Sequence, residues 1–347
     1  MTLSRETIAE ALAGVGVHAP EIVITSDRVV VSIPIDPAKA PEWEPVRRAA
    51  EAVVAAIPGV GRALVSLTAE RQAAPKPAAR ELPKPTELAP PPRFPNLAKV
   101  KRIIAVASGK GGVGKSTTAC NLALALRAQG LRIGILDADI YGPSMPKLFN
   151  LKGRPTVVTG RTLSPLEAYG CKVMSIGFVV DADKALVWRG PMVASAITQM
   201  LRDIAWGTLD VLIVDMPPGT GDAQLTLAQS APLAGAIIVS TPQDLALIDA
   251  RRGVEMFKSV GVPILGLVEN MSYFVCGDCG KRHHIFGHGG AKAEAEKLGV
   301  PFLGEIPLDP LIRERSDRGM PIVVADPDSP QAEAYRAIAA NVMAGFK

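Results

Sequence analysis

The stretch GKGGVGKST at residues 109–117 decides the fold of this chain. It fits the pattern G-x-x-x-x-G-K-[ST], in which backbone N–H groups surround the phosphates of a nucleotide while the lysine neutralises them. Lys115 is that lysine, and the hydroxyl of Ser116 stands where the pattern places a Mg²⁺ ligand. Lys110 is an additional cation that the pattern does not require. The expected nucleotide contacts in this loop are Gly109, Lys110, Gly111, Gly112, Val113, Gly114, Lys115, Ser116 and Thr117.

The flanking sequence predicts a strand before the loop and a helix after it. Residues 103–108 form an apolar run with strong β propensity, and residues 116–128 carry apolar side chains at helical spacing. The N-terminus of such a helix attracts anions through its free N–H groups and its dipole. This context favours a phosphate site over a glycine-rich turn that arose by chance.

Further apolar runs predict an α/β fold. The runs are short and alternate with helical stretches such as 191–204 and 245–257. Because each run looks buried on both faces, we expect a mostly parallel, doubly wound sheet with its ligands at the carboxyl ends of the strands. The predicted strands cover residues 132–136, 211–215, 235–240 and 263–268.

A proline-rich segment divides the chain. Eight prolines fall between Pro75 and Pro95 without a glycine, which favours an extended, semi-rigid linker over residues 71–99. The alternative is a docking ligand for another protein. We therefore predict a small α+β domain over 1–70 and a nucleotide domain over 100–347.

The pattern before the linker is typical of alternating short helices and strands. His18 is the only histidine in residues 1–70, and histidine is the side chain that titrates near neutral pH. We interpret His18 as structural or solvated and not as catalytic. The predicted elements are helices over 4–12 and 41–59, with strands over 22–24, 29–35 and 63–67.

Composition excludes several classes of protein. A net charge of +4 over 347 residues does not indicate a nucleic-acid partner, and no apolar run is long enough to span a bilayer. The four cysteines do not form a disulfide framework, and the N-terminal residues do not resemble a signal peptide. We expect a cytoplasmic protein with no membrane partner.

Carboxylates follow two of the predicted strands. Asp137 and Asp139 follow the run at 132–136, and Asp215 ends the run at 211–215. Acidic residues beside a phosphate loop suit Mg²⁺ and an attacking water. We expect Asp215 to hold the Mg²⁺ shell and Asp139 to orient or deprotonate the water, the alternative for Asp139 being a helix cap.

The segment after Asp215 has the composition of a switch. Residues 217–221 read PPGTG, which does not continue a helix. A loop that senses the γ-phosphate through Mg²⁺ changes its arrangement on hydrolysis and transmits that change to distant surfaces.

Cys276 and Cys279 form a C-x-x-C pair. Two thiolates leave a tetrahedral Zn²⁺ or an iron–sulfur centre half-ligated, so further ligands are needed. They come either from the nearby histidines in a single-chain zinc knuckle or from a second chain in a Cys₄ site. A redox disulfide is less favoured because the motif does not open a helix near a βαβ unit. The nearby histidines are His283, His284 and His288.

Several segments together resemble the Mrp/ApbC family of iron–sulfur cluster carrier ATPases over residues 100 to about 340. The resemblance is specific because the segments agree with the family in their sequences, their order and their spacing. Those segments are KGGVGKST, DADIYGPS, DMPPGTGD, VENMSYFVC with CGDCG and IFGHGGA, and GEIPLDP. Residues 58–70 in turn resemble the end of a MIP18-type domain, although the cysteine-bearing segment of that domain is absent.

The resemblance implies a homodimeric ATPase that binds ATP, Mg²⁺ and a bridging [4Fe–4S] cluster. It assigns the cluster to Cys276 and Cys279, adenine recognition to Asn270, and contact with the nucleotide of the partner subunit to Lys110. Lys110, Lys115 and Asp139 are then the catalytic residues. Apo iron–sulfur proteins would be the cluster acceptors, with scaffold or donor proteins as further partners. Gly277 departs from many relatives, which have proline there.

Two other functions stay open on the sequence alone. A ParA/MinD-like positioning ATPase shares the loop with two lysines, but it needs a terminal lipid anchor or a DNA-binding surface. Residues 330–347 have few cations and look like a packed helix. The other alternative is a zinc-bound regulatory NTPase without carrier activity.

Overall fold

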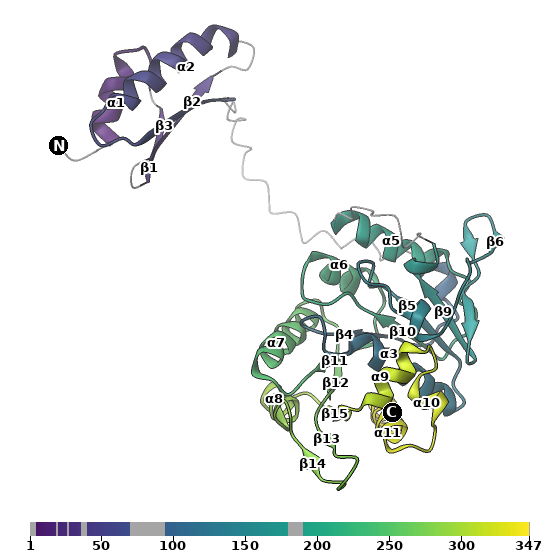
Figure 1. Cartoon of the computed structure of the whole chain (residues 1–347). Helices are drawn as coiled ribbons and strands as arrows, with labels where there is room; N and C mark the ends of the chain where they lie inside the picture. The colour runs from purple at the N-terminus through teal and green to yellow at the C-terminus, as the bar shows by residue number, and fades with distance from the viewer. Residues whose placement is uncertain are drawn as a thin grey trace, which may run out of the picture. The chain divides into compact units, whose positions relative to one another are not determined.

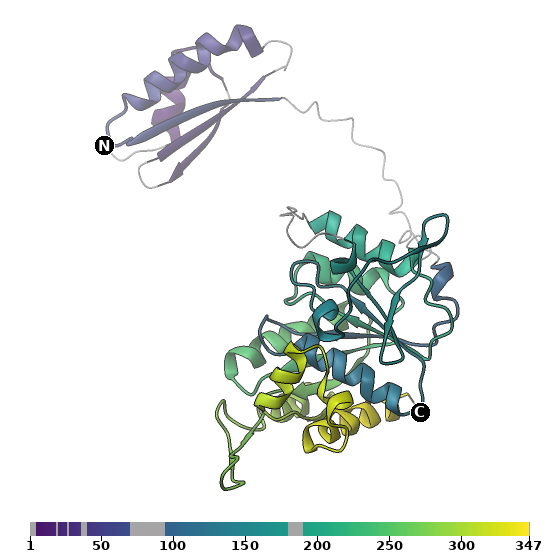
Figure 2. The same ribbon diagram turned by 45° about the vertical axis from the view of Figure 1, so that its right-hand side comes forward.

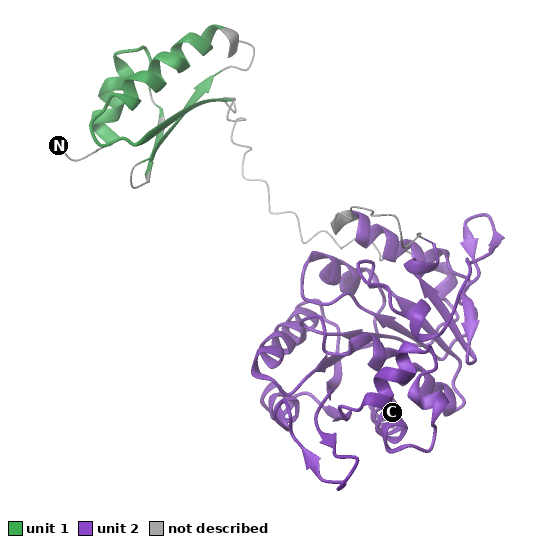
Figure 3. Cartoon of the chain, viewed as in Figure 1, with its two compact units in different colours: residues 1–86 green, residues 87–347 purple. Residues whose placement is uncertain are grey.

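The computed structural model in Figure 1 divides into two compact units, residues 1–86 and residues 87–347. Each unit encloses its own hydrophobic core, and Figure 3 colours the two units separately. Most of the predicted linker at 71–99 lies outside the residues that the structure describes. Those residues are 5–18, 20–25, 28–35, 40–69, 94–179 and 190–346.

The first unit is a three-stranded sheet with two helices. Strand β1 runs antiparallel to β2, and β2 runs parallel to β3. Alternate β2 side chains, from Val29 to Ile35, are buried against Ile8 and Leu12 of α1 and Val54 of α2, because side chains alternate between the faces of a strand. This is the small α+β arrangement that the sequence predicts. Its elements are α1 (Arg5–Ala13), β1 (Glu21–Thr25), β2 (Arg28–Ile35), α2 (Ala40–Ala55) and β3 (Arg62–Ala69).

The second unit is built on an eight-stranded sheet with the order β15-β12-β11-β4-β10-β5-β9-β8. Every neighbouring pair is parallel except β8 and β9, so the predicted doubly wound, mostly parallel sheet is confirmed. The strands are β4 (Ile103–Ala107), β5 (Ile133–Asp137), β8 (Leu166–Ala168), β9 (Cys171–Ser175), β10 (Val211–Asp215), β11 (Gly235–Ser240), β12 (Ile264–Glu269) and β15 (Phe302–Glu305).

Helices cover this sheet. Helix α3 packs on β4, β5 and β10 and against α11, while α7 packs on β11 and α8 on β12. Figure 2 shows α3 in blue beside the yellow C-terminal helices. The helices are α3 (Lys115–Ala128), α4 (Met145–Leu148), α5 (Gly190–Asp203), α6 (Asp222–Ser230), α7 (Asp244–Ser259), α8 (Gly290–Leu298), α9 (Pro310–Asp317), α10 (Ile322–Ala325) and α11 (Pro330–Ala344), with the short 3₁₀ turns η2 (Pro95–Leu97) and η3 (Ile176–Phe178).

Two small hairpins complete the unit. Strands β6 (Val157–Thr159) and β7 (Thr162–Leu163) form one, and β13 (Phe274–Val275) and β14 (Arg282–His283) form the other. No helix in the described part of the chain is long and apolar enough to cross a membrane. Helix α11 buries Tyr335, Ile338 and Val342, which confirms the predicted packed terminal helix.

Burial explains why the central strands read as continuous apolar runs. All residues of β4, β5, β10 and β11 are buried, because helices cover both faces of the sheet. Polar side chains enter only where these strands end. The carboxyl ends of β4, β5, β10 and β12 therefore bring the predicted nucleotide residues to one edge of the sheet.

Candidate functional site

The glycine-rich loop joins β4 to α3. Gly112 and Gly114 have φ angles of 82° and 81°, a region that side chains other than glycine rarely adopt. Gly109 is required for another reason, because a Cβ atom there would lie 2.1 Å from the carbonyl oxygen of Asp249 in α7. The Ser108 hydroxyl donates to the carbonyl of Lys110 over 2.8 Å and closes the loop.

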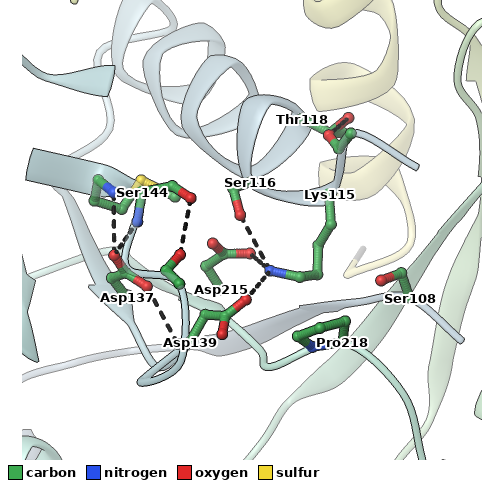
Figure 4. A network of polar contacts seen from close by, with 12 residues as sticks. Ser108, Lys115, Ser116, Thr118, Asp137, Asp139, Ser144, Asp215 and Pro218 are labelled. Carbon is green, nitrogen blue, oxygen red and sulfur yellow. Dashed lines mark hydrogen bonds and ion pairs between the residues drawn. The ribbon is translucent and has the colours of Figure 1, made fainter. Parts of the chain in front are cut away.

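Lys115 lies between two carboxylates (Figure 4). Its Nζ atom is 2.5 Å from Oδ1 of Asp215 and 3.9 Å from Oδ2 of Asp139, and it donates to the Ser116 hydroxyl over 3.2 Å. Only 6% of Lys115 and none of Asp215 is exposed. Electrostatic interactions are strong here because little water screens them.

Asp215 has a spare buried ligand atom. Its Oδ2 atom has no hydrogen-bond partner in the described part of the chain, although Lys115 contacts the other oxygen. Burial raises the pKa of Asp215, and the adjacent Lys115 acts in the opposite direction. An unpartnered carboxylate oxygen near the Ser116 hydroxyl fits the oxygen ligands that Mg²⁺ prefers.

Asp137 and Asp139 differ in their surroundings. Asp137 is fully buried, and its carboxylate accepts hydrogen bonds from the backbone N–H groups of Asp139, Ser144 and Met145 and from the Ser175 hydroxyl. Burial raises the pKa of Asp137 to about 7, and nearby Asp215 adds to that effect. Asp137 therefore anchors the loop that follows β5, a role that sequence analysis did not assign to it.

Asp139 instead faces the phosphate loop. Burial raises its pKa, while Lys115 lowers it. A cavity of about 260 Å³ brings Asp139 together with Lys110, Lys115 and Ser116 and with Pro218 from the predicted switch. These residues come from the ends of β4, β5 and β10, as expected for the carboxyl edge of the sheet.

A second cavity of about 410 Å³ adjoins the loop. Asn270 lines it, and the Asn270 side-chain amide donates to the carbonyl of Val113 over 2.8 Å. Gly114 and Thr117 also line it, as do seven residues from the segment between Pro307 and Asp317. Residues 307–317 were not predicted to line the site, although the segment GEIPLDP is among those that carry the family resemblance.

The predicted switch segment is tied directly to the phosphate loop. The Gly219 N–H donates to the carbonyl of Ser108 over 2.9 Å. Gln224 at the start of α6 donates from Nε2 to the carbonyl of Pro218 over 2.5 Å. A displacement of the phosphate loop would therefore reach α6 through these two contacts.

The cysteine pair lies at the tip of the hairpin formed by β13 and β14, which projects from the lower side of the unit in Figure 1. Cys276 is partly exposed and Cys279 is exposed, whereas Cys120 and Cys171 are buried. The backbone N–H groups of Cys279 and Asp278 lower the pKa of Cys276. The tip therefore favours a thiolate, the form that ligates metals.

The nearby histidines do not join this pair. Among the described residues, the one group of three metal-ligating side chains with ligand atoms within 4.8 Å consists of Glu269, His288 and Glu305, and it contains no cysteine. The structure thus does not assemble the single-chain zinc knuckle left open by the sequence.

A match to a protein-family model shows which family this chain belongs to. The model for NUBPL iron-transfer P-loop NTPases, within the ParA group, matches residues 99–343. The chain belongs to the NUBPL iron-transfer P-loop NTPase family. This confirms the resemblance to iron–sulfur cluster carrier ATPases found in the sequence.

Individual relatives of the NUBPL family agree with this assignment. An iron-sulfur cluster carrier protein of Pseudomonas fragi is 55% identical over 249 residues, which cover 71% of this chain and 87% of the relative. The iron-sulfur cluster transfer protein NUBPL of Mus musculus is 53% identical over 258 residues, covering 74% and 81%.

Solved structures support the fold of this NUBPL-family chain. A nucleotide-binding protein of Archaeoglobus fulgidus in complex with ADP, with cobalt found in it, has a TM-score of 0.60 and 42% identity over 69% of this chain and 93% of its own. The cell division ATPase MinD of Pyrococcus furiosus has a TM-score of 0.53 and 24% identity, over 71% and 99%, which speaks for the fold alone.

Proposed function

We propose that this chain carries a [4Fe–4S] cluster between two copies of itself and delivers it to apo-proteins, and that ATP binding and hydrolysis govern loading or release. The observation that carries the proposal is the Cys276–Cys279 pair on a projecting hairpin, with Cys276 partly exposed and Cys279 exposed, in a chain whose relatives are named iron-sulfur cluster carrier or transfer proteins. Donor or scaffold proteins would supply the cluster.

The ligand count of the hairpin supports a dimer. Cys276 and Cys279 provide two thiolates, and a [4Fe–4S] cluster takes four. No histidine of the described residues completes the set within this chain. A two-fold axis through the cluster would supply the same pair again, because an isologous interface presents identical residues from both sides. Because Cys279 is exposed and Cys276 partly so, the cluster would also be accessible for transfer.

The nucleotide site supports ATP hydrolysis. Lys115 would bind the phosphates in exchange for part of its contact with Asp215, and Asn270 would lie against the base. Ser116 and Asp215 would hold Mg²⁺, which supplies positive charge to the β- and γ-phosphates when bound. Asp139 would orient the attacking water and accept its proton. Lys110 of a second copy would add a cation at the γ-phosphate.

A short path connects the nucleotide site to the hairpin. Asn270 bonds the carbonyl of Val113 in the phosphate loop, and the hairpin begins at Phe274, four residues later. The Ser272 N–H also donates to the carbonyl of Ile306, next to the wall of the larger cavity. A nucleotide that moves the loop or this wall would therefore reposition the cysteines.

Anaerobic cluster reconstitution tests the proposal. We expect the unmodified chain to hold about four iron atoms per two chains, with the visible absorption of a [4Fe–4S] cluster. The Cys276→Ala, Cys279→Ala variant should hold none. The Cys120→Ala, Cys171→Ala variant is the matched control because it removes two buried thiols, and it should keep the cluster. A full cluster in the first variant would contradict the ligand assignment.

The role of Lys110 has its own test. Lys110→Ala should abolish ATP turnover while nucleotide affinity of the single chain stays largely intact, because Lys115 serves the nucleotide of its own chain. Lys152→Ala, an exposed lysine outside the described cavities, is the control. Unchanged turnover in Lys110→Ala would show that no second chain closes over the site with this residue.

A further inference from the structure

Three metal-ligating side chains meet at the edge of the sheet beside the cysteine hairpin. They are Glu269, His288 and Glu305, and one ligand atom from each lies within 4.8 Å of the others. Neither the nucleotide site nor the cysteine pair includes them. His288 belongs to the segment IFGHGGA, whose histidine has no role in the proposed carrier activity.

Strand register brings the two carboxylates together. Glu269 ends β12, Glu305 ends β15, and the two residues are partners in this parallel pair. Among the described residues, the lysines and arginines that form ion pairs do so with other carboxylates, and none pairs with Glu269 or Glu305. The carboxylates of Glu269 and Glu305 have oxygen atoms within 4.8 Å of each other. Two negative charges at that distance repel each other, and a bound cation would relieve the repulsion.

Glu269 is held as metal ligands usually are. Its Oε1 atom accepts from the Ser272 hydroxyl over 2.6 Å and from the Gly289 N–H over 3.0 Å, and its Oε2 atom accepts from the Ala291 N–H over 2.7 Å. Glu269 is completely buried, so these donors fix its orientation. Each oxygen has two lone pairs, and Oε2 therefore keeps one for a metal ion. Donors behind a ligating carboxylate are the usual outer shell of a metal site.

His288 completes the group from the loop between β14 and α8. Its side chain is exposed, and its ring lies 4.2 Å from the ring of His284, measured between centroids. Among the described residues, the hydrogen-bond donors to Glu269 are Ser272, Gly289 and Ala291, so His288 is not one of them. An imidazole and two carboxylates form the mixed nitrogen and oxygen set that first-row divalent metals accept.

We propose that Glu269, Glu305 and His288 bind one divalent first-row transition-metal ion, separate from the cluster and from Mg²⁺. The ion would link the ends of β12 and β15 to the loop that follows the cysteine hairpin. It would thereby stiffen the base of the hairpin while the tip stays free to hold its cargo.

Metal titration of the full-length chain tests this site. The chain carries Cys276→Ser and Cys279→Ser, so that thiolates bind no metal, and it is stripped with a chelator and kept in excess Mg²⁺. Zn²⁺ is titrated by calorimetry, and Co²⁺ by visible absorption. We expect one ion per chain, with affinity reduced at least tenfold by His288→Ala or by Glu305→Gln.

Matched controls separate this site from general surface binding. His283→Ala and Glu296→Gln replace exposed side chains of the same types outside the group and should leave the affinity unchanged. Glu269 is left intact because its hydrogen bonds also hold the start of α8, and circular dichroism would check the fold of each variant. Absence of stoichiometric binding, or equal affinity in the His288 and control variants, would overturn the proposal. Since the tested chain lacks the cluster ligands, the result does not depend on the carrier activity.

Discussion

At the scale of single residues, Asp139 is the group whose ionisation should control turnover. Burial raises its pKa above the ordinary aspartate value of 3.8, although Lys115 opposes the shift. A carboxylate accepts a proton only in its ionised form, so activity should rise as the pH increases through this raised pKa. The acid limb of the rate profile therefore lies at higher pH than for an ordinary aspartate.

Replacement of Asp139 tests this role. Asp139→Asn keeps the shape of the side chain but removes the base, and we expect turnover to fall about 10²–10⁴-fold. Nucleotide affinity should change little, because Lys115 and the loop N–H groups remain. Phosphate release measured across a pH series, together with nucleotide titration, checks both parts. If Asp139→Asn keeps the turnover rate and the acid side of the pH–rate profile of the unmodified chain, another group accepts the proton.

Gly109 shows how one atom constrains the phosphate loop. A Cβ atom at Gly109 would lie 2.1 Å from a backbone oxygen of α7, and backbone cannot move aside as a flexible side chain can. We expect Gly109→Ala to lower the free energy of unfolding by about 1–3 kcal/mol through overpacking. Urea unfolding measures this loss.

Gly111→Ala is the natural control for that variant. A Cβ atom at Gly111 meets no atom within 4 Å, and Gly111 is exposed and has no positive φ. The free energy of unfolding of Gly111→Ala should stay within about 0.5 kcal/mol of that of the unmodified chain, as for most surface substitutions. If Gly109→Ala and Gly111→Ala lower the free energy of unfolding equally, the close approach of α7 is not the reason that residue 109 must be glycine.

At the scale of elements, the strands with continuous apolar runs were the ones that sequence analysis found. The strand predicted over 211–215 is β10, and the one over 235–240 is β11, because both are buried on each face. Strands β8, β9 and β15 of the same sheet were not predicted. Strand β8 is only three residues long. Strands β9 and β15 read CKVMS and FLGE, so a lysine interrupts the apolar run in one, and a glycine and a glutamate interrupt it in the other.

The same reasoning explains which parts of the site were predictable. Lys115, Ser116 and Asp215 could be placed because a local motif and the ends of predicted strands carry them. The separate roles of Asp137 and Asp139 depend on contacts with Ser144, Met145 and Ser175, which lie well beyond any local pattern. Likewise, the wall formed by 307–317 reaches the nucleotide loop only through tertiary packing.

The cysteine hairpin should react differently from the rest of the thiols. Backbone N–H groups at the tip lower the pKa of Cys276, whereas burial raises the pKa of Cys171 to about 12. Because the thiolate is the nucleophile, Cys276 should be alkylated by iodoacetamide at a lower pH than an ordinary thiol, while Cys171 stays unmodified in the folded chain. Mass spectrometry of peptides from cluster-free protein, alkylated across a pH series, measures both rates. Equal rates at 276 and 171 would contradict the hairpin geometry.

At the scale of the whole molecule, the chain holds two separate cores. The core of residues 1–86 includes Ile8 and Val31, and the core of residues 87–347 includes Ile104 and Trp206. The first unit is small, so its burial per residue is limited and its stability should be the lower of the two. Each unit should therefore unfold in a transition of its own.

A nucleotide should shift only one of these transitions. The residues that line the nucleotide cavities all belong to the unit 87–347. ADP at about 100 times its Kd stabilises a folded unit by about 2.7 kcal/mol, which raises the Tm of a unit of this size by roughly 5–10 °C. Calorimetry of the full chain with and without Mg-ADP measures the shift, and Lys115→Ala provides the control that should lose it. A single unfolding transition, or an equal rise in the Tm of both transitions, would show that the two cores unfold together. In that case the binding free energy of ADP in one unit would also stabilise the other.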